Sequence, residues 1–174
     1  MSAEAPEAPE APVAPDCQEP PPAPQIESFE VKAQVKGKKW AVELQTVERD
    51  WKSDYPFHCA CQEGNVADVE KLISPQVLNK CDDDQWSGLH YASWYGHIEV
   101  VKRLVNAKAT VNVTNGQGST PLHLAAGVGK LEVLGYLLQH GADPKQQNKD
   151  KQTPAEIART VKPDGFELIL KVLS

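Results

Sequence analysis

Apolar residues between positions 50 and 174 recur at the three- and four-residue spacing of amphipathic helices. Leu89, Ala92 and Ser93 share one side of a first helix, and a stripe of larger apolar residues follows in a second helix. The stripes of the second helices are Val66, Val69, Leu72 and Ile73; Ile98, Val101, Leu104 and Val105; and Leu131, Leu134, Leu137 and Leu138. One helix pair cannot enclose such a stripe by itself, so the pattern predicts that successive pairs stack on one another.

Residues 28–49 follow a different pattern, in which apolar and polar residues alternate. This two-residue period is typical of β-strands, and a Gly-Lys turn at residues 37–38 predicts a hairpin. In that register one face carries the alternating apolar side chains, namely Phe29, Val31, Ala33, Val35, Trp40, Val42 and Leu44. Because an isolated hairpin is only marginally stable in water, we expect this face to cover the first helix pair as an N-terminal cap.

Residues 1–27 are rich in proline and in acidic side chains. They hold eight of the 14 prolines and six acidic residues, without a single Lys or Arg. Such a composition cannot bury enough apolar surface to form a core, so it predicts a disordered tail. The tail accounts for the formal net charge of -6, because the rest of the chain contains 18 acidic and 18 basic residues. A body without excess positive charge argues against direct nucleic-acid binding.

The helical region repeats itself with a period of about 33 residues. His123 follows His90 by 33 residues, and His58 precedes His90 by 32. The stretch "STPLHLAAGVGKLEVLGYLLQHGADP" at residues 119–144 resembles the ankyrin-repeat family, in which "TPLHxA" opens the first of two antiparallel helices. The resemblance covers residues 50–174 and implies a mainly α fold, an ankyrin-repeat solenoid of about four helix-pair repeats. The expected repeats span residues 50–81, 82–114, 115–147 and 148–174, and follow the β-hairpin and the disordered tail.

The resemblance also assigns roles to positions within the repeats. It implies that the three motif histidines form hydrogen bonds to loops. The fourth copy departs from the pattern, because Arg159 stands where the third copy has Ala126 and "VKPDG" replaces the usual turn between helices. Both departures suit a terminal repeat whose outer face meets water.

Aromatic side chains of the second copy fall outside the apolar stripe. With Leu89 as the origin, Trp94 and Tyr95 lie at about 140° and 240° around the helix, so we expect both to point away from the core. The family resemblance places these positions on the inner, concave face, next to the tips of the preceding loops. Matching by position predicts a protein-binding surface of Trp51, Lys52, Asp54, Asp83, Asp84, Trp86, Trp94, Tyr95, Gln117, Ser119 and Val128. In an alternative arrangement, Trp51 and Trp86 fold back onto their own loops.

Chemical sites other than a binding surface find little support. The four cysteines have no spacing typical of a disulfide framework, which predicts free thiols. Cys59 and Cys61 near His58 suggest zinc as an alternative, but residues two apart on a helix face in different directions, and no second ligand pair has zinc spacing. No set of nucleophile, base and orienting group is present. We therefore expect no cofactor, no metal and no enzymatic activity.

The sequence thus predicts a monomeric adaptor or regulator that binds another protein through the concave groove. Acidic residues beside the aromatics predict a partner segment that is apolar with basic neighbours. No apolar run is long enough to insert into a membrane, and we expect the protein in the cytoplasm or the nucleus. A second hypothesis is a self-regulated adaptor whose own proline-rich tail occupies the groove.

Overall fold

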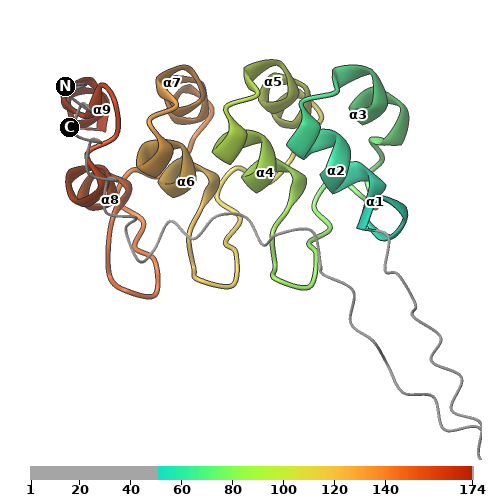
Figure 1. Cartoon of the computed structure of the whole chain (residues 1–174), viewed down its shortest axis with the longest axis horizontal. Coiled ribbons are helices and arrows are strands. Elements are labelled where there is room, and N and C mark those ends of the chain that lie inside the picture. The colour runs from blue at the N-terminus through green and yellow to red at the C-terminus, as the bar shows by residue number, and fades with distance from the viewer. Residues whose placement is uncertain (1–50, 174) are drawn as a thin grey trace, which may run out of the picture.

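The computed structural model describes residues 51–173, which form short helices joined by tight turns and longer loops (Figure 1). The helices are α1 (Trp51–Asp54), α2 (Pro56–Glu63), α3 (Val66–Leu72), α4 (Gly88–Tyr95), α5 (Ile98–Asn106), α6 (Pro121–Val128), α7 (Leu131–Gln139), α8 (Pro154–Val161) and α9 (Phe166–Leu173). This part of the chain contains no β-strand, only an isolated antiparallel bridge between Cys81 and Ser87. The hairpin predicted at residues 28–49 and the tail predicted at residues 1–27 lie outside the described residues.

The helices are arranged in two rows (Figure 1). Helices α2, α4, α6 and α8 form one row, and α3, α5, α7 and α9 form the other. Each helix packs against the next helix of its own row and against its partner in the other row. The long loops between successive pairs extend beyond the first row (Figure 1). This is the stack of helix pairs that the repeated apolar stripes predicted.

A left-handed residue separates the two helices of each pair. Gly64, Gly96 and Gly129 follow α2, α4 and α6 with φ angles of 73°, 82° and 84°. Glycine suits this position because it has no side chain to clash in the left-handed region. In the fourth pair Lys162 takes the same position with φ of 52°, so the left-handed cap is kept although the glycine is missing, and residues 162–165 form a longer connection to α9.

Buried histidines join α2, α4 and α6 of the first row to the loop that follows each helix pair. The backbone N–H of Ser87 donates to Nδ1 of His90 over 3.1 Å, and Nε2 of His90 lies 3.0 Å from the carbonyl oxygen of Ser119. Nε2 of His58 lies 2.9 Å from the carbonyl oxygen of Lys80 in the same way. A ring that accepts at Nδ1 and donates at Nε2 is the neutral imidazole. The hydrogen bonding to loops implied by the family resemblance is therefore confirmed.

The third copy repeats this arrangement, and the fourth copy varies it. Nε2 of His123 lies 3.1 Å from the carbonyl oxygen of Gln152, while the backbone N–H of Thr120 donates to Nδ1 over 3.1 Å. In the fourth copy Glu156 replaces the histidine and closes a capping box, because the Thr153 N–H donates to its carboxylate over 2.7 Å. The carboxylate of Glu156 thus caps its own helix, whereas the histidine rings reach the following loop.

The apolar core runs between the two rows along the stack. Leu89, Ala92 and Ser93 are almost completely buried, as predicted. In the row of α3, α5, α7 and α9, the most buried residues are Val69, Val100, Val101, Leu104, Leu134, Leu137 and Ile169. Arg159 of the fourth copy is exposed, in agreement with a terminal repeat whose outer face meets water. None of the helices between residues 51 and 173 has the length and apolar character needed to cross a bilayer.

Candidate protein-binding surface

We define the inner surface as the ends of α2, α4 and α6 at Glu63, Tyr95 and Val128, together with the loop tips at residues 82–85, 115–118 and 148–151. The helix ends come from the first three copies, and the loop tips come from the second, third and fourth copies at equivalent positions. The sequence predicted that these positions would carry the binding residues. The structure brings some of them together at this surface and buries others.

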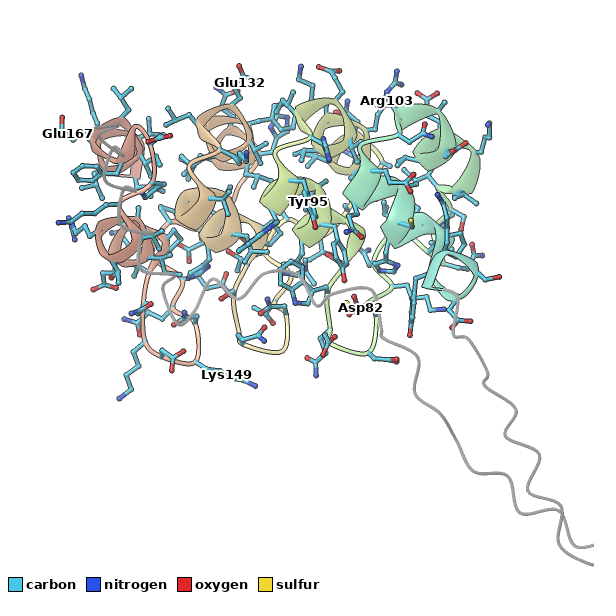
Figure 2. All side chains as sticks on the ribbon, in the orientation of Figure 1. Asp82, Tyr95, Arg103, Glu132, Lys149 and Glu167 are labelled. Atoms are coloured by element: carbon cyan, nitrogen blue, oxygen red, sulfur yellow. The ribbon has the colours of Figure 1, made fainter. Side chains whose placement is uncertain are left out.

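Tyr95 is the last residue of α4 and exposes 38% of its surface (Figure 2). The side-chain amide of Gln62 donates a hydrogen bond of 3.1 Å to the phenol oxygen. The ring stacks on His97, with centroids 6.0 Å apart and an interplanar angle of 13°. His97 is held in turn, because its Nε2 lies 2.8 Å from the carbonyl oxygen of Gln62. Tyr95 therefore points away from the core, as predicted, and its ring is fixed in one orientation.

Trp94 lies deeper than Tyr95. Its side chain is half-buried and packs against the core. The indole meets the edge of Trp86, with ring centroids 6.1 Å apart and an interplanar angle of 70°. The prediction that Trp94 points away from the core is thus wrong in part, because a second indole from the preceding loop covers one side of the ring. Trp94 directly precedes Tyr95 in the chain.

Trp86 was expected on the surface, and this prediction is wrong. Only 3% of the residue is exposed. The indole lies against the rings of Tyr91 and His90, with centroid separations of 5.2 and 5.9 Å. The alternative, in which Trp86 folds back from the loop tip, agrees better with the structure. Trp86 therefore supports the aromatic surface from beneath and does not form part of it.

Asp82 causes the loop to fold inward. This residue is 7% exposed, and one carboxylate oxygen accepts the backbone N–H groups of Trp86 at 2.8 Å and Asp84 at 3.0 Å. The other oxygen accepts the phenol O–H of Tyr91 at 2.6 Å. Burial and this hydrogen bond raise the pKa of Tyr91, so its O–H remains a donor. The sequence analysis missed Asp82, although Asn115 and Asn148 at the same repeat position are a detectable signal of a shared turn.

The third copy shows the same distinction between loop interior and surface. Ser119, which was predicted to bind a partner, is 1% exposed, so this prediction is also wrong. Its backbone N–H donates to the side chain of Asn115 over 2.9 Å, just as Trp86 donates to Asp82. The turn therefore places this repeat position inside the loop in both copies. Gln117 and Val128 are half-buried and remain part of the inner surface.

Two acidic residues lie at the tip of the first long loop. Asp83 and Asp84 are both exposed, as predicted. The phenol O–H of Tyr55 donates to the carboxylate of Asp83 over 2.9 Å. This contact connects the loop tip to the segment between α1 and α2. The acidic charge of the second copy is thus held at the tip of its loop.

The residues predicted from the first copy lie on α1. Lys52 forms an ion pair of 2.7 Å with Glu63 at the end of α2, and both side chains are largely exposed. Asp54 is exposed as well. Trp51 begins α1, and its side chain lies outside the described part of the structure. The first copy therefore brings a paired basic and acidic side chain to the inner surface.

Adjacent loop tips are connected through their backbones. The N–H of Gly116 donates to the carbonyl of Asp84 over 3.2 Å, and the N–H of Lys149 donates to the carbonyl of Gln117 over 3.0 Å. A β-carbon at Gly116 would lie 3.0 Å from the Asp84 oxygen, so the missing side chain permits this close approach. Lys149 lies at the tip of the loop between α7 and α8 (Figure 2), and its side-chain ammonium donates to the Gly116 carbonyl over 2.6 Å. The loop tips thus form a continuous, preformed edge.

Buried titratable groups outside this surface have structural roles. Burial lowers the pKa of His90 to about 4 and also lowers the pKa values of His58 and His123. Burial raises the pKa of Cys61 to about 12, which keeps its thiol protonated. Between residues 51 and 173, no group of three His, Cys, Asp or Glu side chains is arranged to hold a metal ion.

Comparison with known families agrees with the repeated helix pairs and their histidine-to-loop hydrogen bonds. The model of the family described as ankyrin repeats (3 copies) matches residues 31–115, 57–148 and 107–172. The chain belongs to the ankyrin-repeat family. The resemblance predicted from "TPLH" and the 33-residue period is therefore confirmed. The family match accounts for the stack of helix pairs and identifies no particular partner.

Several larger proteins contain repeats similar to this chain. Ankyrin repeat and SOCS box protein 3 of Bos taurus is 44% identical over 99 residues, which are 55% of this chain and 19% of that protein. Palmitoyltransferase AKR1 of Lachancea kluyveri is 40% identical over 93 residues, which are 51% of this chain and 13% of that protein. The human transient receptor potential cation channel subfamily A member 1 is 30% identical over 98 residues, 55% of this chain and 9% of the channel. The chain thus spans less than a fifth of the length of these relatives.

Proposed function

We propose that this ankyrin-repeat protein is a non-enzymatic adaptor or regulator that binds a partner protein on its inner surface. The observation that carries the proposal is the exposed ring of Tyr95, which Gln62 and His97 hold in one orientation. An aromatic side chain that is already ordered loses little conformational entropy on binding and contributes a large contact area. Such residues are frequent hot spots of protein interfaces.

The surroundings of Tyr95 support a preformed binding site. Backbone hydrogen bonds connect the loop tips of successive copies, so the edge next to the inner helices does not have to be ordered by the partner. Trp94 precedes Tyr95 in the chain, and Val128 occupies the equivalent position of the next repeat. Both side chains are half-buried, and they extend the apolar area around Tyr95. Recognition by a rigid surface of this kind avoids the entropic cost of coupled folding.

The charges along the loop tips suggest the chemistry of the partner. Asp83 and Asp84 make the first tip acidic, whereas Lys149 and Lys151 bring exposed positive charge to the tip two copies later. We infer that the bound segment is apolar where it covers Tyr95 and carries basic residues beside Asp84. Complementary charges of this kind mainly set orientation and association rate.

We also propose that the protein acts as a monomer in the cytoplasm or the nucleus. The cysteines at positions 59, 61 and 81 are free thiols, which suits a reducing compartment. Repeats of this family are enclosed by their neighbours within one chain, so stacking requires no second subunit.

Affinity purification from cells with a tagged full-length chain tests the proposed binding site. We expect Tyr95→Ala to reduce the recovery of specific partners at least about tenfold, as for a hot-spot residue. The matched control is Tyr136→Ala on α7 of the other row, where the tyrosine also stacks on a histidine, His140, at 4.1 Å. Quantitative mass spectrometry then compares the three preparations. Equal recovery with Tyr95→Ala, or an equal loss with Tyr136→Ala, would contradict the proposal.

A second arm of the experiment separates open binding from occupancy by the tail. A chain that begins at residue 28 retains the complete inner surface and lacks the proline-rich segment. If the inner surface is open in the full-length protein, both chains recover the partners equally. A markedly higher recovery by the shorter chain would instead favour the self-regulated adaptor.

A further inference from the structure

The N-terminal end of the stack exposes apolar residues whose equivalents in the second or third copy are covered. Leu72 at the end of α3 is 36% exposed, whereas its equivalents Leu104 and Leu137 are completely buried. Pro56 at the start of α2 is exposed, whereas its equivalent Pro121 at the start of α6 is buried. The difference arises because α5 and α7 each have a preceding helix pair, while α3 has none among residues 51–173.

Two adjoining pockets mark this end of the stack. One, of about 320 Å³, and another, of about 200 Å³, share Pro56 and Leu72 as lining residues. Lys52 lines the smaller pocket and Asp54 the larger one, so helix α1 runs beside both. The end face is therefore hollowed, apolar at its centre, and bordered by the first described residues of the chain.

The charges around the smaller pocket are compensated locally. Lys71 forms an ion pair of 2.9 Å with Asp68, and Lys52 forms one of 2.7 Å with Glu63. The two ion pairs leave none of these four charges for an occupant of the end face to neutralise. The occupant gains free energy mainly by covering Leu72 and Pro56. This chemistry requires an apolar segment.

The chain itself supplies such a segment next to the end face. Residues 28–49 immediately precede α1 and carry apolar residues at alternating positions, including Phe29, Val31, Trp40 and Leu44. The first match to the ankyrin-repeat family covers residues 31–115, so most of this segment lies within the stretch that the family model aligns together with α1 to α5. Its attachment to α1 gives it a high effective concentration at the pockets.

We propose that residues 28–49 cover the N-terminal end of the stack and pack their apolar side chains on Leu72 and Pro56. The segment closes the end face in the way that a preceding helix pair closes the equivalent positions of the second and third copies. Trp40, its largest apolar side chain, is the natural occupant of the pocket beside Leu72. The inner surface around Tyr95 remains available for the partner.

Thermal unfolding of full-length variants tests this proposal. We expect Leu72→Ser to lower the melting temperature by about 3–6 °C, the shift expected when a buried apolar contact is lost in a domain of this size. Val172→Ser is the matched control, because Val172 is 47% exposed at the other end of the stack and should tolerate the change. Equal shifts for the two variants would overturn the proposal, since Leu72 would then be uncovered.

A double-mutant cycle identifies the segment that covers Leu72. If Trp40 packs on Leu72, the shift of the Trp40→Ser/Leu72→Ser double variant is clearly smaller than the sum of the two single shifts. Additive shifts would overturn this contact. A photo-crosslinking residue at position 72 gives an independent readout, and we expect its products to map to residues 28–49. Products that map to residues 1–27, or that join two chains, would overturn the choice of this segment.

Discussion

The second and third copies share one backbone arrangement but differ in a cluster of side chains. At equivalent positions the second copy carries Trp86, Tyr91, Trp94 and Tyr95, and the third carries Ser119, Leu124, Gly127 and Val128. All four differences replace a small or aliphatic residue with an aromatic one. The third copy thus shows what the repeat needs for stacking. The excess aromatic surface of the second copy marks the place where recognition is expected.

The side chain that supports each loop also differs between the two copies, and the one in the second copy accepts more hydrogen bonds. The side-chain oxygen of Asn115 accepts two backbone N–H groups, at 3.0 and 2.9 Å. The carboxylate of Asp82 accepts two equivalent groups and, in addition, the phenol of Tyr91. The additional acceptor ties the aromatic cluster to the loop. Three of the four aromatic residues therefore serve to hold the cluster in place, and Tyr95 is the one that reaches solvent most fully.

The largest effect is expected when the buried indole is removed. Trp86→Ser, which introduces the residue of the third copy, should lower the free energy of unfolding by about 4 kcal/mol because it leaves a cavity beneath Trp94. Urea denaturation measures this change. Tyr95→Val, the corresponding replacement at the exposed position, should change stability by less than about 0.5 kcal/mol. Similar losses of unfolding free energy for the two variants would contradict the view that Trp86 supports the aromatic cluster whereas Tyr95 is a surface residue.

A smaller effect is expected at the carboxylate that organises the loop. Asp82→Ala should lower the free energy of unfolding by about 3 kcal/mol, since two backbone N–H groups and the Tyr91 hydroxyl lose their acceptor. Asp82→Asn introduces the residue found at position 115 and keeps an oxygen for the backbone donors, so we expect a loss of only about 1 kcal/mol. The same urea experiment would count against this role if both substitutions cost the same.

The smallest of the three effects concerns pH and the buried histidines. In the folded protein the pKa of His90 lies at about 4, below its ordinary value of 6.5. Between these values the unfolded chain binds more protons, so the stabilisation is complete above pH 6.5 and is lost as the pH falls toward 4. From pH 7 to pH 5, His90 alone should account for a loss of about 2 kcal/mol.

Urea midpoints at pH 7 and pH 5 measure this dependence on pH. His58 and His123 act in the same direction, because burial lowers their pKa values as well. Identical midpoints for the native protein at the two pH values would argue against neutral, buried rings.

Which features could be predicted from sequence depends on how local their physical causes are. The helix pairs follow from spacings within about 33 residues, and the family resemblance implied the histidine hydrogen bonds to loops; the structure agrees with both. The prediction failed at Trp86 and Ser119 because their burial depends on a side chain four residues earlier, Asp82 or Asn115, that turns the loop inward. The angular position of Trp94 on its helix also did not predict its contact with Trp86, because Trp86 lies on a loop.

The amino-acid sequence by itself determined the repeat period, the identity of the stacked apolar faces and the concentration of aromatic residues in the second copy. These features are encoded by residue types at regular intervals, and hydrophobic burial with helical geometry is enough to interpret them. Only the tertiary structure decided which aromatic side chains reach the surface. That outcome depends on a buried carboxylate, a neighbouring glutamine and the packing of one copy on the next, and none of these has a periodic signature.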